Sequence, residues 1–313
     1  MGIEGMEKGS SGKRRVEMKK GILTFVFVPK VEHPWFDEVH KGAQMQAKLL
    51  SKQLGINVII DYQTPKKADV SEQNKILEEA AATNPAGIAL DPVDYDGSRA
   101  IIEEIMKSGI PVILFDAPAP EGSGLSSIGN DFSDQARLAA QSLAKDVGYK
   151  GKVAVMQGFP SAPNHAERYQ AHLETLAQYP DIEVIDGGID NDSVQEAQSQ
   201  ASAVIAENPD LVGYLNCDAC AAGIAAAVEE AGKRGQIKIY SMDSLIEILE
   251  YIKTGTISAT SATNPQMQGS MSVLMMWQAH NGVEIPKAVD TGIAYIDSTN
   301  VDDWIELMGG TSN

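Results

Sequence analysis

Residues 87–116, which read GIALDPVDYDGSRAIIEEIMKSGIPVILFD, contain the pattern that decides the fold. Two short runs that are apolar on both faces, 87–90 and 111–115, flank a stretch with helical spacing of its apolar residues, 95–108. Runs of the first kind are typical of parallel strands buried between layers of helices. Gly109 stands just past the helical stretch, where a left-handed cap is favoured. The segment therefore predicts a strand, a helix and a second strand in succession.

The same alternation continues over the rest of the chain from residue 21. Six more apolar runs predict strands at 22–28, 58–62, 153–156, 183–185, 211–215 and 237–240. The other segments with helical spacing are 36–53, 70–83, 134–147, 164–178, 193–206 and 219–231. Gly55, Gly148 and Gly232 again follow helical segments. Repeated strand–helix units of this kind predict an open parallel sheet with helices on both faces.

The series of units runs twice, over about 21–129 and over about 130–263. Each set has about the size of one doubly wound domain. We therefore predict an α/β fold of two doubly wound parallel-sheet lobes joined by a three-crossing hinge, with crossings near 129–130, 263–264 and 290–292. The expected N-terminal lobe comprises 21–129 plus 264–291, and the expected C-terminal lobe comprises 130–263 plus 292–313.

The composition excludes several classes of protein. The chain has 313 residues, with 25 lysines and arginines against 43 aspartates and glutamates, and a formal charge of −18. Nucleic-acid binders need a basic surface to displace phosphate counterions, and anionic membrane surfaces attract basic segments, so we expect neither partner. A hydrophobic content of 43% is that of a globular chain, which at this length buries a core without disulfides. The longest nearly apolar stretch near the start, 22–29, falls far short of the ~20 residues that span a membrane.

The first residues, 1–20, read MGIEGMEKGSSGKRRVEMKK and differ from the rest in charge. They hold six basic and three acidic residues, which leaves −21 on the remainder. They lack the apolar core of about 7–15 residues that a secretory signal needs. The Gly-Ser-Ser-Gly at 9–12 favours a cloning remnant that replaces a removed signal, and the alternative is the native start of a cytoplasmic protein. On either interpretation we expect 1–20 to be disordered.

Polar side chains follow most of the predicted strands. Ligands of open α/β sheets bind outside the carboxyl ends of the strands, so these positions test directly for a binding site. An aspartate there can also be only the N-cap of the next helix, but the pattern across both halves is less easily produced by capping alone. Trp35 and Phe36, after the first strand, are either core aromatics or a wall that covers the apolar C–H face of a sugar. The polar residues concerned are Lys30, His33, Asp91, Asp116, Gln157, Asn216, Asp218 and Asp243, with Arg168 in the first turns of a helix.

Several signatures of catalysis and of cofactor binding do not occur in the sequence. It has no G-x-G-x-x-G, no G-x-x-x-x-G-K-[ST], no G-x-S-x-G and no H-E-x-x-H. We therefore expect no cofactor, no metal and no enzymatic activity, with a cleft enzyme that acts on sugars through its carboxylates as the minor alternative. Cys217 and Cys220 form a C-x-x-C, which we interpret as a strand-end residue and a small apolar helix residue rather than as a redox pair.

The body of the chain, over about 21–300, resembles the class I periplasmic solute-binding proteins for monosaccharides. These are proteins of the ribose-binding type, related to the effector-binding domains of lactose-repressor-like regulators. The resemblance implies two lobes that close on one small ligand and deliver it to the membrane permease of an ABC importer or to a chemoreceptor. The motifs that carry it, in order, are Pro34-Trp35-Phe36, Gly42-Ala43, Asp91-Pro92-Val93-Asp94, Ile110-Pro-Val-Ile-Leu-Phe-Asp116, Ile128-Gly-Asn-Asp131, Ala166-Glu-Arg168, Asn216-Cys-Asp218 and Met242-Asp243.

The resemblance also implies roles for individual residues. It implies a ligand site with Trp35 and Phe36 as stacking aromatics and Arg168 as the second-lobe fork onto hydroxyls. Its other expected contacts are Asp91 and Asp116 in the first lobe, Asn191, Asn216, Cys217 and Asp243 in the second, and Thr263 and Asn264 at the last hinge. His33, Ala117 and Cys217 depart from the ribose pattern, which argues against ribose. The Val-Pro-Lys30 turn resembles the branch that binds rhamnose-like sugars and furanosyl autoinducers, in which the lysine reaches the ligand.

The charges of these candidate residues restrict the class of ligand that the site can bind. The carboxylates of Asp91, Asp116 and Asp243 outnumber Lys30 and Arg168 by one, and by two when the aspartate at 218 is counted. An anionic ligand would leave buried charge uncompensated, whereas the hydroxyls of a neutral ligand can donate to the carboxylates. We therefore expect a small neutral sugar or sugar alcohol as the ligand of a monomeric protein that is periplasmic or extracellular and membrane-associated. The main alternative is a chemoreceptor or sensor protein for a furanosyl autoinducer-like or deoxysugar ligand. A repressor would need a DNA-binding segment of about 50–60 residues ahead of the lobes.

Overall fold

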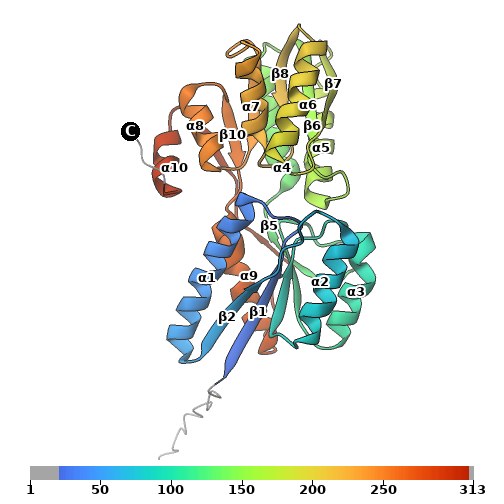
Figure 1. Cartoon of the computed structure of the whole chain (residues 1–313), viewed down its shortest axis with the longest axis vertical. Helices are drawn as coiled ribbons and strands as arrows, with labels where there is room; N and C mark the ends of the chain where they lie inside the picture. The colour runs from blue at the N-terminus through green and yellow to red at the C-terminus, as the bar shows by residue number, and fades with distance from the viewer. Residues whose placement is uncertain (1–20, 310–313) are drawn as a thin grey trace, which may run out of the picture.

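The computed structural model describes residues 21–309. It contains two six-stranded sheets, each with helices on both faces, in two lobes stacked end to end (Figure 1). The fold class predicted from the sequence is thereby confirmed, since all strand pairs are parallel apart from one at the edge of the second sheet. The expectation of disorder for 1–20 lies outside the described residues.

The N-terminal lobe consists of β1 (Ile22–Val28), α1 (Pro34–Leu54), β2 (Asn57–Tyr62), α2 (Val70–Ala82), β3 (Gly87–Leu90), α3 (Tyr95–Lys107), β4 (Val112–Phe115), β5 (Ser126–Gly129), α9 (Pro265–His280) and β11 (Ala288–Asp290). Its strand order is β11-β5-β4-β3-β1-β2. Phe25 and Phe27 of β1 pack on one face of the sheet against α1 and α9. Val26 and Val28 pack on the other face against α2 and α3, so the run is apolar throughout because both faces are covered.

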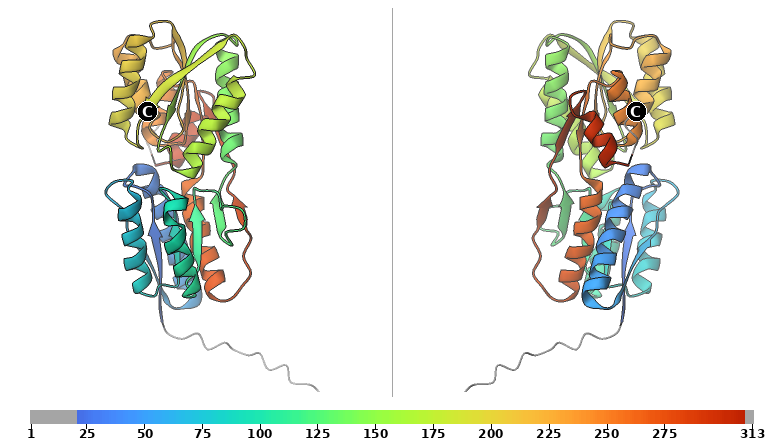
Figure 2. Two further views of the ribbon diagram at one scale, coloured as in Figure 1. Left: turned by 90° about the vertical axis from the view of Figure 1, so that its right-hand side faces the viewer. Right: turned by 90° about the vertical axis from the view of Figure 1, so that its left-hand side faces the viewer.

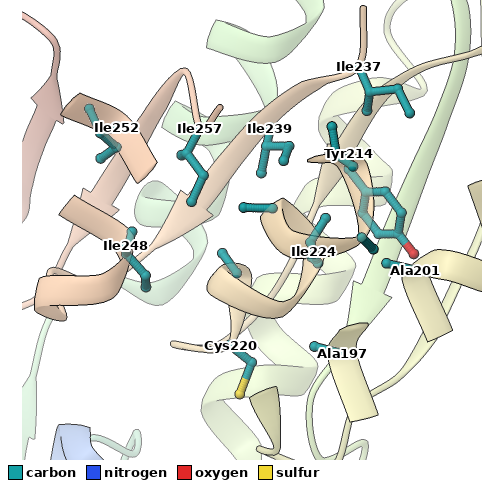
Figure 3. Packing of buried hydrophobic residues seen from close by; sticks show 14 of the residues in the cluster. Ala197, Ala201, Tyr214, Cys220, Ile224, Ile237, Ile239, Ile248, Ile252 and Ile257 are labelled. Carbon is teal, nitrogen blue, oxygen red and sulfur yellow. The ribbon is translucent and has the colours of Figure 1, made fainter. Parts of the chain in front are cut away.

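The C-terminal lobe consists of α4 (Phe132–Asp146), β6 (Gly151–Gln157), α5 (Pro163–Leu176), β7 (Ile182–Ile189), α6 (Val194–Glu207), β8 (Leu211–Leu215), α7 (Ala221–Glu230), β9 (Lys238–Met242), α8 (Ile246–Thr254), β10 (Ala259–Ala262), β12 (Ala294–Asp297) and α10 (Val301–Leu307). Its strand order is β12-β10-β9-β8-β6-β7. Figure 3 shows the core on one face of this sheet, where Tyr214 and Ile239 meet Ile224 of α7 and Ile248 and Ile252 of α8. The other face packs against α4 and α5.

The chain crosses between the lobes after β5, after β10 and between β11 and β12. The first and third crossings lie side by side, since the N–H and the hydroxyl of Thr291 donate to the carbonyl oxygen of Gly129 at 2.7 and 2.8 Å. Figure 2 shows the connecting segments running between the two stacked lobes. Within residues 21–309, no helix combines the length and the hydropathy that a membrane crossing requires.

Helices α1 and α9 are packed backbone to backbone at two glycines. A Cβ atom on Gly42 would lie 1.9 Å from the carbonyl oxygen of Gln266, and one on Gly269 would lie 2.0 Å from the carbonyl oxygen of Val39. Neither neighbour is a flexible side chain that could move aside. The two helices can therefore approach this closely only because both positions are glycine. The attachment of α9 to the N-terminal lobe depends on the same two residues.

Each predicted strand and helix corresponds to an observed element, with ends that differ by at most four residues. The largest difference is in β7, which was expected only over 183–185 and runs on through two glycines to Ile189. The glycines expected to end helices, Gly55, Gly109, Gly148 and Gly232, all have positive φ angles. The sequence patterns did not indicate β5, β10, β11, β12, α8, α9 and α10. Most of these elements are short, and β10 (ATSA) has no apolar run although all four of its residues are buried.

Candidate functional site

The carboxyl ends of the strands of both sheets meet between the lobes, around a small cavity. Several hydrogen bonds join the lobes around it. The Trp35 indole N–H donates to the Thr263 hydroxyl at 3.1 Å, and the Asn164 amide donates to Asp116 at 2.7 Å. The lobes are thus closed on each other. The cavity is lined by His33, Trp35, Phe36, Asp116, His165, Arg168, Asp192, Asp218, Ala219 and Asp243.

The aromatic wall of the site stands at the first turn of α1. The ring of His33 caps this helix by accepting from the N–H of Trp35 at 3.2 Å, and Pro34 fixes its first residue. The rings of Trp35 and Phe36 meet edge to face, with centroids 5.1 Å apart. The Tyr62 hydroxyl donates to the Phe36 carbonyl oxygen at 2.9 Å and holds this turn on the sheet. Trp35 and Phe36 therefore serve both the core and the cavity wall.

Lys30 and Asp91 form a buried ion pair beside this wall. Nζ of Lys30 lies 3.2 Å from a carboxylate oxygen of Asp91, and both side chains are almost fully buried. Burial alone would lower the pKa of Lys30, but neighbouring carboxylates, foremost Asp91 and Asp192, outweigh it and raise this pKa. Burial raises the pKa of Asp91 well above its usual range against the opposing charge of Lys30. The Gln73 amide donates to the Asp91 and Pro29 carbonyl oxygens at 2.8 and 3.0 Å, which fixes both strand ends.

Asp116 and Asp243 occupy matching positions after β4 and β9, and both have left-handed backbone conformations, with φ of 48° and 67°. Such angles are uncommon outside glycine and concentrate at functional sites. One Asp116 oxygen lies 3.8 Å from a guanidinium nitrogen of Arg168. Burial raises the pKa of Asp116, and the charges of Arg168 and Lys30 oppose the rise. Asp243 accepts from both the hydroxyl and the N–H of Thr263, which links it to the Trp35 indole.

Arg168 reaches the cavity from the first turns of α5 and is 1% exposed. Its Nε donates to the Gln135 side chain at 2.8 Å, and one terminal nitrogen donates to the Cys217 carbonyl oxygen at 3.1 Å. The Phe132 ring lies beneath the guanidinium at 4.9 Å. The other terminal nitrogen is buried, has no hydrogen-bond partner in the described part of the chain, and faces Asp116. Arg168 is thus held in place with one donor directed at the cavity.

The structure brings most of the residues expected from the sequence together. Two are not in the group: Asn191 is exposed and donates to Glu196 at 2.7 Å, and Asn264 is exposed and caps α9. Asn216 and Cys217 lie buried behind the cavity, where the Cys217 carbonyl oxygen holds Arg168 and Asn216 donates to Asp218. The expected residues at or beside the cavity are Lys30, His33, Trp35, Phe36, Asp91, Asp116, Arg168, Asp243 and Thr263.

Sequence reasoning missed His165 and Asp192 in the cavity wall. The expected end of β7 at 185 left Asp192 outside the series of strand-end residues, although its position just past the true end fits that series. His165 carried no sequence signal apart from its place three residues before Arg168. Cys220, expected to pack as a small apolar residue, is buried in the core cluster, and its Sγ lies 3.8 Å from Nε2 of His33 in the other lobe.

The site is more acidic than the sequence indicated. Five carboxylates, those of Asp91, Asp116, Asp192, Asp218 and Asp243, surround the two cations Lys30 and Arg168. Burial raises the pKa of Asp192 to about 6, against the opposing charge of Lys30. Among the residues that the structure describes, buried oxygens without a hydrogen-bond partner occur on Asp91, Asp192 and Asp218, and a terminal nitrogen of Arg168 is a donor without a partner. The closed site therefore favours a ligand with many hydrogen-bond donors and no negative charge.

His172, one turn beyond Arg168 on α5, is fully buried and donates from Nε2 to the Asn216 carbonyl oxygen at 3.1 Å. Burial lowers its pKa to about 4, below the ordinary value of 6.5 that it has in the unfolded chain. Below pH 6.5 the unfolded chain therefore binds a proton at this histidine that the folded protein does not bind. The contribution of neutral His172 to the stability of the fold is complete above pH 6.5 and is lost as the pH falls towards 4.

We expect this loss to reach about 3 kcal/mol in the free energy of unfolding between pH 7 and pH 4. Chemical denaturation of the protein and of His172→Gln at both pH values isolates the effect, because the difference between the two proteins cancels the other titrating groups. Equal pH dependence of the two proteins would contradict the assignment of a neutral, buried His172.

Several known proteins resemble this chain in sequence and in fold. A family model for the periplasmic binding protein domain matches residues 24–284. The D-apiose import binding protein of Actinobacillus succinogenes is 24% identical over 232 residues, which cover 72% of this chain and 73% of that protein. The ribose import binding protein RbsB of Escherichia coli is 24% identical over 257 residues, which cover 82% of this chain and 83% of that protein.

The same likeness extends to solved structures. An ABC transporter solute-binding protein from Agrobacterium vitis, bound with alpha-D-tagatopyranose, has a TM-score of 0.84 and 26% identity to this chain. The match covers 93% of this chain and all of that one. The family model alone spans well over half of the sequence. The chain therefore belongs to the periplasmic binding protein domain family.

Proposed function

We propose that this protein binds one small neutral monosaccharide or sugar alcohol between its lobes and delivers it to the membrane permease of an ABC importer, without catalysing a reaction. The observation that carries the proposal is the set of buried acceptor oxygens on the strand ends of both lobes, beside Trp35 and Phe36 and the free donor of Arg168. The names of the relatives and the sugar bound in the solved structure support the ligand class. A periplasmic or extracellular location follows from the same role.

The ligand residues in this proposal are those that line or adjoin the cavity. Trp35 and Phe36 cover the C–H face of the sugar, and the carboxylates of Asp116 and Asp243 accept from its hydroxyls. Arg168 donates to a hydroxyl or ring oxygen through its free terminal nitrogen. Lys30 and Asp91 form an ion pair beside the two aromatic rings, and the Lys30 ammonium can donate to a ligand oxygen.

Binding is linked to closure of the lobes in this proposal. The division into lobes at 129/130, 263/264 and 291/292 is supported by the strand membership of the two sheets. The interlobe hydrogen bonds of Trp35 and Asn164, and that of Ser161 to the Val93 carbonyl oxygen at 3.1 Å, form only when the lobes meet. A ligand that bridges the same surfaces would stabilise this closed arrangement, which is the form that a permease would receive.

A thermal-shift screen over neutral pentoses, hexoses, deoxysugars and alditols tests the proposal. A sugar present at 100 times its dissociation constant should stabilise the fold by about 2.7 kcal/mol. Phosphorylated and carboxylated analogues of the same sugar should leave the melting temperature unchanged, because their charge adds to that of the buried carboxylates. Stabilisation by a charged sugar alone, with none by any neutral polyol, would contradict the proposed ligand class.

A further inference from the structure

Three side chains on the C-terminal side of the cavity form a compact group. A ring nitrogen of His165 and one carboxylate oxygen each of Asp192 and Asp218 lie within 4.8 Å of one another, and all three residues line the cavity. The backbone of Gly158 lies against two of them, His165 and Asp218. A Cβ atom there would lie 2.3 Å from Nδ1 of His165 and 2.6 Å from Oδ2 of Asp218, so this close approach needs glycine.

Each member of the group has a second atom that fixes its orientation. Nδ1 of His165 accepts from the N–H of Phe159 at 2.8 Å, and Oδ1 of Asp218 accepts from the N–H of Cys220 at 3.0 Å. Asp192 follows a residue with positive φ, has a φ of 58° itself, and is 9% exposed. Oδ2 of Asp192 and Oδ2 of Asp218 are buried and have no hydrogen-bond partner within residues 21–309. The side chains are therefore held in place close together, and the two carboxylates each keep an unused oxygen.

The hydrogen bond from Phe159 decides which atom of His165 carries the proton. Because Nδ1 accepts this bond, the proton of the neutral ring is on Nε2. Burial, with the nearby charges of Lys30 and Arg168, lowers the pKa of His165 well below its ordinary value and keeps the ring neutral. The group therefore presents one N–H donor at Nε2, which lies 4.0 Å from Oδ2 of Asp192, and two carboxylate acceptors.

This combination of donor and acceptors distinguishes between possible occupants. A metal ion ligated by His165 at this atom needs a lone pair at Nε2, where the ring carries a hydrogen instead. A hydroxyl can accept from Nε2–H and donate its own hydrogen to a carboxylate at the same time. No direct hydrogen bond joins the three members within residues 21–309, so their polar atoms at the cavity are open to such a hydroxyl.

The geometry points to a hydroxyl-binding subsite, in which His165 donates to one sugar hydroxyl and Asp192 and Asp218 accept from it and from its neighbour. The assignment rests on the proposed sugar-binding function and adds the residues that read one position of the sugar. Removing that hydroxyl from the sugar and removing the His165 donor from the protein eliminate the same hydrogen bond. The two losses of binding free energy should therefore not be additive.

Two substitutions of His165 test the subsite against a purely structural role. Asparagine retains an acceptor near Nδ1 for the N–H of Phe159 and removes the Nε2 donor, whereas glutamine retains an N–H donor near Nε2. The probes are D-ribose, D-arabinose, D-allose, D-galactose and D-tagatose, each titrated by calorimetry together with its monodeoxy analogues. The wild-type protein should bind its preferred sugar about tenfold to a hundredfold more tightly than one particular deoxy analogue.

His165→Asn and Asp192→Asn should each weaken binding of the parent sugar by about the same factor and leave binding of that deoxy analogue nearly unchanged. His165→Gln should retain most of the discrimination. Wild-type affinity and selectivity in His165→Asn would overturn the subsite while leaving the sugar-binding function in place. Stabilisation of the wild type by calcium or zinc chloride alone, absent in Asp192→Asn, would assign the group to a cation instead. No binding of any of the sugars would overturn the function and the subsite together.

Discussion

Asp116→Asn will weaken binding of the preferred neutral sugar by about 100-fold, measured by isothermal titration calorimetry. The carboxylate of Asp116 is 4% exposed and faces the free terminal nitrogen of Arg168 at 3.8 Å. An asparagine presents an N–H₂ group in place of one oxygen, so the buried guanidinium loses its counter-charge and a sugar hydroxyl loses a charged acceptor. Removing one partner of a buried pair costs about 3–5 kcal/mol, and every 1.4 kcal/mol is about tenfold in affinity.

Asparagine is the informative replacement at this position because it tolerates the left-handed backbone angle of residue 116, which alanine does not. A matched control is Asp210→Asn, at an exposed aspartate that pairs with Lys152 far from the cavity and should leave the affinity unchanged. Melting curves of both variants identify any loss of folding. An unchanged affinity in a folded Asp116→Asn protein would show that the sugar does not contact this strand end.

Gly42→Ala will lower the free energy of unfolding by about 3 kcal/mol or more, measured by chemical denaturation. The new Cβ atom would lie 1.9 Å from the carbonyl oxygen of Gln266, and within 2.7 Å of two more backbone atoms of α9. Overpacking against a flexible side chain costs about 1–3 kcal/mol, and here the obstacle is the backbone of a neighbouring helix. Helices α1 and α9 must move apart to accept the methyl group, which opens the core around Val39 and Val273.

The matched control is Gly97→Ala, a glycine on α3 whose added Cβ would meet side chains alone, a methyl group of Val70 at 3.0 Å and the carboxylate of Asp94 at 3.5 Å. Alanine has the higher helix propensity by about 1 kcal/mol, so this variant should differ from the wild type by no more than that amount. Equal stabilities of the Gly42 and Gly97 variants would show that the contact between α1 and α9 is looser than the structure describes.

Much of the fold could be predicted from the sequence because buried parallel strands are apolar on both faces. The stretch 87–116 gave β3, α3 and β4 within one residue at each end. The elements that escaped prediction owe their place to tertiary contacts. β10 has the sequence Ala-Thr-Ser-Ala and is buried by the strands on either side of it. α9 buries Gln268, Gly269 and Ser272 as well as Val273 and two methionines, so its buried face is not marked by apolar residues alone.

The candidate site could be predicted where a residue directly follows a strand. Asp91, Asp116 and Asp243 follow β3, β4 and β9, and the fold itself brings these strand ends together. The prediction of site residues failed where the direction of a side chain depends on unusual backbone angles. Asn191 and Asp192 are neighbours that both have positive φ, and the chain turns so that the first faces solvent and the second faces the cavity. No sequence pattern indicates that turn, so the resemblance led to the exposed neighbour.

The account depends most on the claim that one neutral sugar lies between the two lobes. A crystal structure of the protein with the sugar that gives the largest thermal shift tests it directly. We predict one monosaccharide in the cavity, with its C–H face on Trp35 and Phe36 and its hydroxyls within hydrogen-bond distance of Asp116, Asp243 and Arg168. Density for the sugar on the outer surface of either lobe, with the space between these residues filled by water alone, would contradict the account.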